Sequence, residues 1–187
     1  MTNTKKSILA GILIGLGVII NLQSEIPALG ALLFSFGLLT IINMQLNLYT
    51  GKIGFFDNIN INDGKFLFHT LFYNCVGIGL TIALYALGNQ NFIDTILTAA
   101  NIKFSKDILT LFINACFCGA LIHFAVKNKT TILTIFAIMI FILIGAEHCV
   151  ADFAYFTFVP NGINTIKFIA IILGNSLGAI VIERLCE

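Results

Sequence analysis

Long apolar stretches follow one another along almost the whole chain, with short polar connections between them. A helix needs about 20 apolar residues to cross the hydrocarbon core of a bilayer. The pattern therefore predicts an all-α membrane protein that forms one transmembrane domain over residues 1–187. We expect six transmembrane helices, within residues 7–22, 27–56, 66–87, 108–126, 131–159 and 166–182.

Two of these stretches are longer than a single span requires. As continuous helices, residues 27–56 and 131–159 would each measure about 45 Å, whereas the hydrocarbon core is about 30 Å thick. The first contains a polar stretch at residues 45–51, and the second contains three ionisable side chains at residues 145–152. Non-helical backbone persists at membrane depth only where it lines a cavity or is buried in protein. We therefore predict that helices two and five are broken, next to a pore or binding site.

The two breaks occupy matching places, in the second span of each set of three. The third spans also match, because Asn74 precedes Gly77 by three residues as Asn175 precedes Gly178. With three spans in each half, the second half must be inverted relative to the first. The pattern predicts an inverted repeat of about residues 7–88 and 107–184, which is typical of transporters and channels.

Composition supports a membrane protein and excludes several other classes. Apolar residues make up 58% of the 187 residues and charged residues only 10%, compared with about 25% in soluble domains. The mean hydropathy is +0.99, and the net charge of +1 gives no basic surface for nucleic acid. We expect the lipid bilayer as a partner, and no nucleic acid, cofactor or metal. We interpret the five cysteines as packing residues.

The basic residues predict the orientation in the membrane. With six spans, both termini lie on the same side. Cytoplasmic loops carry an excess of Lys and Arg, so we expect a multi-pass protein of the plasma (inner) membrane with both termini in the cytoplasm. The terminal side holds Lys5, Lys6, Lys52, Lys65, Lys127, Lys129 and Arg184, and the other side holds Lys103, Lys106 and Lys167.

Glu147, His148 and Asp152 lie deep within the fifth apolar stretch. Ionisable groups at such depth are rare and usually functional. The three side chains either contribute to a lumen or neutralise one another and hold the break in place.

Three motifs resemble the formate–nitrite transporter family. They are Phe34-Ser-Phe-Gly-Leu38, Leu48-Tyr-Thr-Gly51 and Gly145-Ala-Glu-His-Cys-Val-Ala-Asp152. The resemblance implies an aquaporin-like protomer with six helices, and a homopentamer in which each protomer has its own pore. It also implies small monovalent anions as substrates, such as formate, nitrite, hydrosulfide, lactate or acetate.

The resemblance also implies roles for single residues. His148 matches the family's central pore histidine, and Thr50 matches the threonine of the loop that breaks helix two. Either Lys103 or Lys106 matches the lysine that attracts the anion. The outer constriction would hold Phe34 and Phe141, and the inner one Leu38, Leu48 and Tyr49.

The chain departs from the family pattern at three places. Gly119 and Asp152 stand where the family usually has asparagine. The cytoplasmic segment before the first span has only about six residues, so we expect no N-terminal gate of the kind proposed for the family. Asp152 either reaches His148 across one helical turn and stabilises its imidazolium, or caps the resumed helix.

Physical chemistry connects these residues to a mechanism. A bare anion in an apolar constriction loses its hydration at a high free-energy cost, whereas a neutral weak acid crosses more easily. A histidine that titrates near neutrality can lend a proton, and a nearby lysine raises the local anion concentration. We predict a channel or transporter, not an enzyme, that moves an anion together with a proton. The alternatives are a channel for neutral solutes, or a metal carrier that uses residues 147–152.

Overall fold

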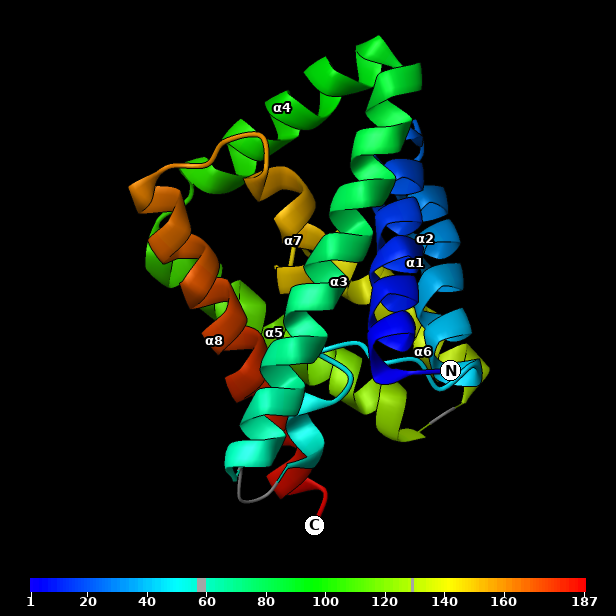
Figure 1. Cartoon of the computed structure of the whole chain (residues 1–187), viewed down its shortest axis with the longest axis vertical. Helices are drawn as coiled ribbons and strands as arrows, with labels where there is room; N and C mark the ends of the chain where they lie inside the picture. Colours follow the sequence, from blue (N-terminus) through cyan, green and yellow to red (C-terminus); the bar gives the residue numbers. More distant parts are fainter. Residues whose placement is uncertain (57–59, 129) are drawn as a thin grey trace.

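The computed structural model describes residues 1–56, 60–128 and 130–187. Lys129, which we counted on the terminal side, lies outside these residues. The described chain is helical throughout (Figure 1). Its helices are α1 (Asn3–Gln23), α2 (Pro27–Asn43), the 3-10 helix η1 (Ile53–Phe55), α3 (Ile61–Gly88), α4 (Gln90–Ser105), α5 (Ile108–Asn128), α6 (Thr131–Leu143), α7 (Cys149–Phe156) and α8 (Gly162–Leu185).

Four of the described helices, α1, α3, α5 and α8, are long and apolar enough to cross a membrane. Helices α2 and α6 are also apolar but shorter, with 17 and 13 residues. Large apolar side chains such as Phe68, Leu84 and Leu173 point outward from the long helices and are more than half exposed. Outward apolar faces on long apolar helices are what a lipid environment requires.

The two longest apolar stretches do not form continuous helices. Helix α2 ends at Asn43 and α6 ends at Leu143, each followed by a residue with positive φ, Gln45 (50°) and Gly145 (69°). The next backbone N–H then donates to a carbonyl five residues earlier, from Leu46 to Ile41 at 2.9 Å and from Ala146 to Phe141 at 2.9 Å. This pattern satisfies carbonyl groups at the end of a helix while the chain turns away.

After the turn, the two stretches continue differently. Residues 46–50 run without regular helix into a turn and η1. Residues 146–148 are equally irregular, but α7 begins at Cys149 and continues for eight residues.

Two helix pairs form the most extensive contacts, α1 with α3 and α5 with α8. Glycines allow their backbones to approach closely. A Cβ atom at Gly77 would collide with the carbonyl oxygen of Ile8, and one at Gly178 with that of Cys116. Gly119, a departure from the family pattern, likewise lies directly against the backbone of Asn175. A larger residue at 119 would push α5 away from α8.

Helix α4 corrects our expectation of a short polar connection between residues 88 and 107. Phe92, Ile96, Ala100 and Phe104 recur every four residues and are buried, so α4 is an amphipathic helix. It lies at one end of the molecule, whereas α1 begins and α8 ends toward the other end (Figure 1). Helix α4 brings Lys103 close to α7. The amine of Lys103 lies 5.1 Å from the centre of the Tyr155 ring on α7.

Candidate functional site

Asn74 holds the irregular segment that follows α2. Its Nδ2 donates to the carbonyl oxygens of Ser7 at 2.7 Å and Asn47 at 2.8 Å, and its Oδ1 accepts from the N–H of Tyr49 at 2.9 Å. The side chain is fully buried. One amide thus supplies partners for two backbone groups of the irregular segment, which lack them within a helix, and it ties the segment to a carbonyl of α1.

Asn175 does the same for the segment that follows α6. Its Nδ2 donates to the carbonyl oxygens of Ala115 at 2.8 Å and Glu147 at 2.7 Å, and its Oδ1 accepts from the N–H of Cys149 at 2.8 Å. In the sequence, the two asparagines serve only as markers of a repeat. A buried amide at the same place in both halves was the available signal for their anchoring role.

The two irregular segments meet at His148 and Thr50, both of them buried. His148 immediately precedes α7, and its Nδ1 accepts a hydrogen bond from the N–H of Ala151 at 3.1 Å. Its Nε2 lies 2.8 Å from Oγ1 of Thr50. A neutral imidazole has one acceptor and one donor nitrogen, so Nε2 carries the proton and donates it to Thr50. A second proton on Nδ1 would break the bond that caps α7.

Glu147 forms ion pairs with both candidate lysines. Its Oε2 accepts from Lys103, and its Oε1 accepts from Lys106 at 2.7 Å. Lys103 also pairs with Oδ1 of Asp152 at 3.0 Å. The four side chains form a cluster of two ammonium and two carboxylate groups, which we call the lysine–carboxylate cluster. The sequence left Lys103 and Lys106 as alternatives, and the structure places both in this cluster.

The contacts of Asp152 match neither expectation for this residue. In the part of the chain that the structure describes, no hydrogen bond joins its side chain to His148 or to a backbone N–H of α7. Its Oδ1 faces Lys103, while its Oδ2 is buried without a hydrogen-bond partner. The expectation failed because His148 lies outside the helix with extended backbone, φ −111° and ψ 109°. The rule that residues four apart share a helix face does not apply there.

A small cavity of about 100 Å³ lies next to His148. Phe34 and Phe141 line it together with Lys103 and Asp152. The two phenylalanine rings meet edge to face, with centroids 5.9 Å apart, and Phe141 lies 6.0 Å from the His148 ring. Of the two candidate lysines, Lys103 lines this small cavity and Lys106 does not.

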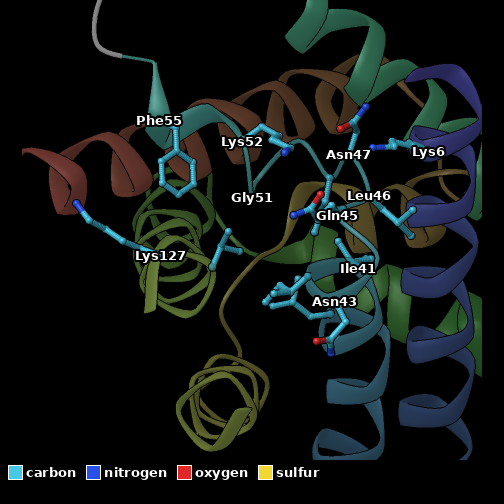
Figure 2. Close-up of a pocket in the computed structure, with 14 residues that line it drawn as sticks. Lys6, Ile41, Asn43, Gln45, Leu46, Asn47, Gly51, Lys52, Phe55 and Lys127 are labelled. Atoms are coloured by element: carbon cyan, nitrogen blue, oxygen red, sulfur yellow. The ribbon is translucent and has the colours of Figure 1, made fainter. Parts of the chain in front are cut away.

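A larger cavity of about 720 Å³ opens on the side of α1's first turns (Figure 2). Leu38 and Leu48 line it, as do Lys6, Lys52 and Lys127, which come from separate parts of the chain. Figure 2 also shows the amides of the irregular segment at this cavity. Tyr49 lines neither cavity, because its hydroxyl lies 2.8 Å from Oγ of Ser176 on α8.

Comparisons with known proteins agree on one family. The sequence model of the family described as "Formate/nitrite transporter" matches residues 2–186. A structure titled "Pentameric formate channel with formate bound" shares 18% identity, with a TM-score of 0.77 over 98% of this chain and 92% of that one. A structure titled "FNT family ion channel" shares 22% identity, with a TM-score of 0.82 over 98% of this chain and 87% of that one. No curated protein matches the chain in sequence.

Proposed function

Because the chain belongs to the formate/nitrite transporter family, we propose that it is a membrane channel for small monovalent anions of weak acids, such as formate, hydrosulfide and nitrite. The observation that carries this proposal is the contact between His148 and Thr50. It supports the proposal because His148 lines one cavity, the proposed outer one with aromatic walls. Thr50 directly precedes Gly51, which lines the proposed inner cavity with leucine walls. Small volume on the outer side favours small solutes.

The proposed architecture has six spans, with α2–η1 and α6–α7 as broken helices two and five. Matching hydrogen bonds support an inverted repeat of about residues 7–88 and 107–184. Asn74 and Asn175 bind the carbonyl before and the N–H after the middle residue of each irregular segment, which is Leu48 or His148. The ends of α2 and α6 also have matching backbone hydrogen bonds, from the N–H of Leu46 to Ile41 and from the N–H of Ala146 to Phe141.

The proposed pathway begins at the outer cavity, where the ammonium group of Lys103 can contact the arriving anion. The anion then passes Phe34 and Phe141 and reaches His148. There the imidazole Nε2–H can turn from Thr50 to the anion, and the threonine hydroxyl provides a second donor. Because both donors lie in a buried site, they compensate part of the hydration that the anion loses.

The exit of the proposed pathway lies between Leu38 and Leu48. A charged anion is poorly stabilised by these apolar side chains, so we propose that it crosses as the neutral acid, together with a proton. Lys6, Lys52 and Lys127 then surround the inner cavity and favour release of the ionised product. Glu147 acts mainly as the anchor that holds Lys103 and Lys106.

We also propose a homopentamer in the plasma membrane, in which each protomer carries its own pore. One structural neighbour is titled a pentameric channel, and this supports the assembly state. Both termini lie in the cytoplasm in this proposal, because Lys5, Lys6, Lys52 and Lys127 lie on their side and Lys103 and Lys106 on the other.

Flux in proteoliposomes tests the proposed function. Liposomes that contain the purified protein should take up formate, hydrosulfide and nitrite faster than liposomes without protein. Glycerol and zinc should enter at the background rate. Equal uptake of glycerol and formate would support a neutral-solute channel instead, and zinc uptake would support a metal carrier.

A further inference from the structure

One oxygen of Asp152 stands out among the buried polar atoms near the outer cavity. Asp152 is 1% exposed, and its Oδ2 has no hydrogen-bond partner within the described chain. A buried carboxylate oxygen without a donor is destabilising, because it has lost its water and gained nothing in exchange. A proton on Oδ2 removes this penalty and converts the atom into a donor.

The protonation state of Asp152 determines the net charge of the lysine–carboxylate cluster. Lys103 contacts it from α4, and the carboxyl group of Glu147 interacts with it both directly and through that shared lysine. The two lysines balance two carboxylates while Asp152 is ionised, so an arriving anion meets no net positive charge. With Asp152 protonated, the cluster carries one net positive charge. The other titratable groups that face Asp152 are Tyr155 and Cys149 on α7 and Cys118 on α5.

His148 is a poor carrier for an additional proton in this arrangement. Its Nδ1 already accepts from the N–H of Ala151, and its Nε2–H is donated to Thr50. Protonation of Nδ1 would place two N–H groups against each other and remove the cap of α7. Asp152, by contrast, has a free acceptor atom and lines the same cavity.

We propose that Asp152 carries the proton that accompanies each anion through the pore. A proton from water on the outer side binds Oδ2, and the protonated carboxyl then donates a hydrogen bond to the anion in the outer cavity. The Oδ2–H bond breaks as the proton bonds to the anion's oxygen or sulfur, and the bonding electron pair stays on Asp152. The neutral acid then passes His148 and Thr50 toward Leu38 and Leu48, and the carboxylate takes a new proton from the outer side. This inference rests on the proposed function, for which it names the proton-binding residue.

Simultaneous measurement of formate and proton entry tests the proposal. Proteoliposomes with labelled formate outside and a pH-sensitive dye inside report both fluxes, and a potential-sensitive dye reports net charge movement. The wild-type protein should take up formate with protons and without charge movement. Asp152→Asn should take up formate more slowly, because the bare anion crosses the apolar exit poorly. The uptake that remains should have a lower ratio of protons to formate than the wild type and should be accompanied by charge movement.

A matched control comes from Asp94→Asn, which removes an exposed carboxylate on α4 and should leave the proton ratio unchanged. If Asp152→Asn keeps the wild-type proton ratio and stays electroneutral, Asp152 is not the proton carrier. If wild-type protein takes up no formate at all, the proposed function fails instead, so the two failures are distinguishable.

Infrared spectroscopy tests the same proton without transport. Between about pH 5 and 8, the wild-type protein should show the carbonyl band of a protonated, buried carboxylic acid, which moves on exchange into D₂O. The band should be absent from Asp152→Asn. If that variant does not fold, Asp152→Glu should shift the band. Absence of any protonated carboxyl band from the wild type over this range, or a band that neither variant alters, would overturn the proposal.

Discussion

The irregular segments after α2 and α6 are built alike but carry different chemistry. Each begins with a positive φ, at Gln45 or Gly145, and a buried asparagine binds two backbone groups of each segment and one carbonyl of a neighbouring helix. The anchoring asparagine fixes the backbone without using the side chain of the residue in the middle. That residue is therefore free to differ, and it is Leu48 in the first segment and His148 in the second.

The difference at this one position changes the structure of the residues after it. His148 accepts from the N–H of Ala151, so α7 starts with a capped first turn. Leu48 has no such acceptor, and its carbonyl instead receives the N–H of Gly51 at 3.1 Å, which leads into a turn and η1. One segment thus supplies an apolar wall to the inner cavity, and the other supplies a polar group beside the outer cavity.

Close glycine packing should be equally necessary in both halves, and its loss should have the largest effect. Gly77→Val and Gly178→Val each force a side chain against a backbone carbonyl of the neighbouring helix. We expect each variant to lower the free energy of unfolding by about 4 kcal/mol or more. Size-exclusion chromatography after heating in detergent measures the loss.

Gly79→Val is the matched control in the same helix, because a Cβ there would meet only Phe153, at an ordinary 3.8 Å. It should keep most of the wild-type thermal stability. If Gly77→Val kept the wild-type thermal stability while Gly178→Val lost it, the two helix pairs would not be equivalent.

The asparagine anchors provide the second test of the comparison. Asn74→Ala and Asn175→Ala each remove three hydrogen bonds and leave one carbonyl and one N–H group of the irregular segment buried without partners. We expect each to lower the free energy of unfolding by about 3 kcal/mol, as measured by denaturant or thermal unfolding in detergent. The control is Asn43→Ala, which removes one exposed hydrogen bond from the side-chain amide to the carbonyl of Leu39 and should have little effect. A large difference between the two anchor variants would contradict their equivalence.

The sequence was sufficient to predict the parts of the molecule that depend on the length of an apolar stretch or on a local motif. The helices α1, α3, α5 and α8 coincide with four predicted apolar stretches, because a membrane-length apolar run has few other solutions. The ends of α2 and α6 were also visible, since polar residues interrupt runs too long for one span. The family motif placed Thr50 and His148 in the two interruptions, and the structure brings them together.

The rest depends on three-dimensional contacts that spacing along the chain does not reveal. Helix α4 escaped notice because Gln90, Asp94, Asn101 and Lys103 interrupt its apolar residues, so it lacks a long apolar run. Its lysines reach Glu147 across 41 and 44 residues of chain, so only the fold identifies their partner. The direction of Asp152 depends on where α7 begins, and a shift of one residue in that start would turn its carboxylate toward a different neighbour.

A third test separates the two roles of His148, which caps α7 and contacts Thr50. Asparagine is a strong N-cap residue, whereas alanine is a poor one. His148→Ala should therefore lower the free energy of unfolding by about 1 kcal/mol, and His148→Asn should retain most of the wild-type value. Both variants should lose formate flux in proteoliposomes. If His148→Asn is as unstable as His148→Ala, the cap contributes little and the second segment resembles the first more closely.

The smallest effect should arise where the first helices of the two halves begin. Helix α1 starts after Thr2, whose hydroxyl accepts from the N–H of Lys5, and this cap carries no charge. Asp107 precedes α5, and hydrogen bonds from the hydroxyl and then the N–H of Thr110 hold its pKa below the ordinary value.

Since the pKa of Asp107 is lower in the folded than in the unfolded state, its contribution is present above the unfolded value of about 4 and disappears as the pH falls through the folded value. The side chain is exposed, so the change should be small. We expect the thermal midpoint of the wild type to approach that of Asp107→Asn as the pH is lowered from about 7 to 3. Asparagine keeps the cap but does not titrate, whereas Thr2→Ala should lower the midpoint equally at every pH. A constant difference between the wild type and Asp107→Asn would mean that the two helix starts do not differ in their response to pH.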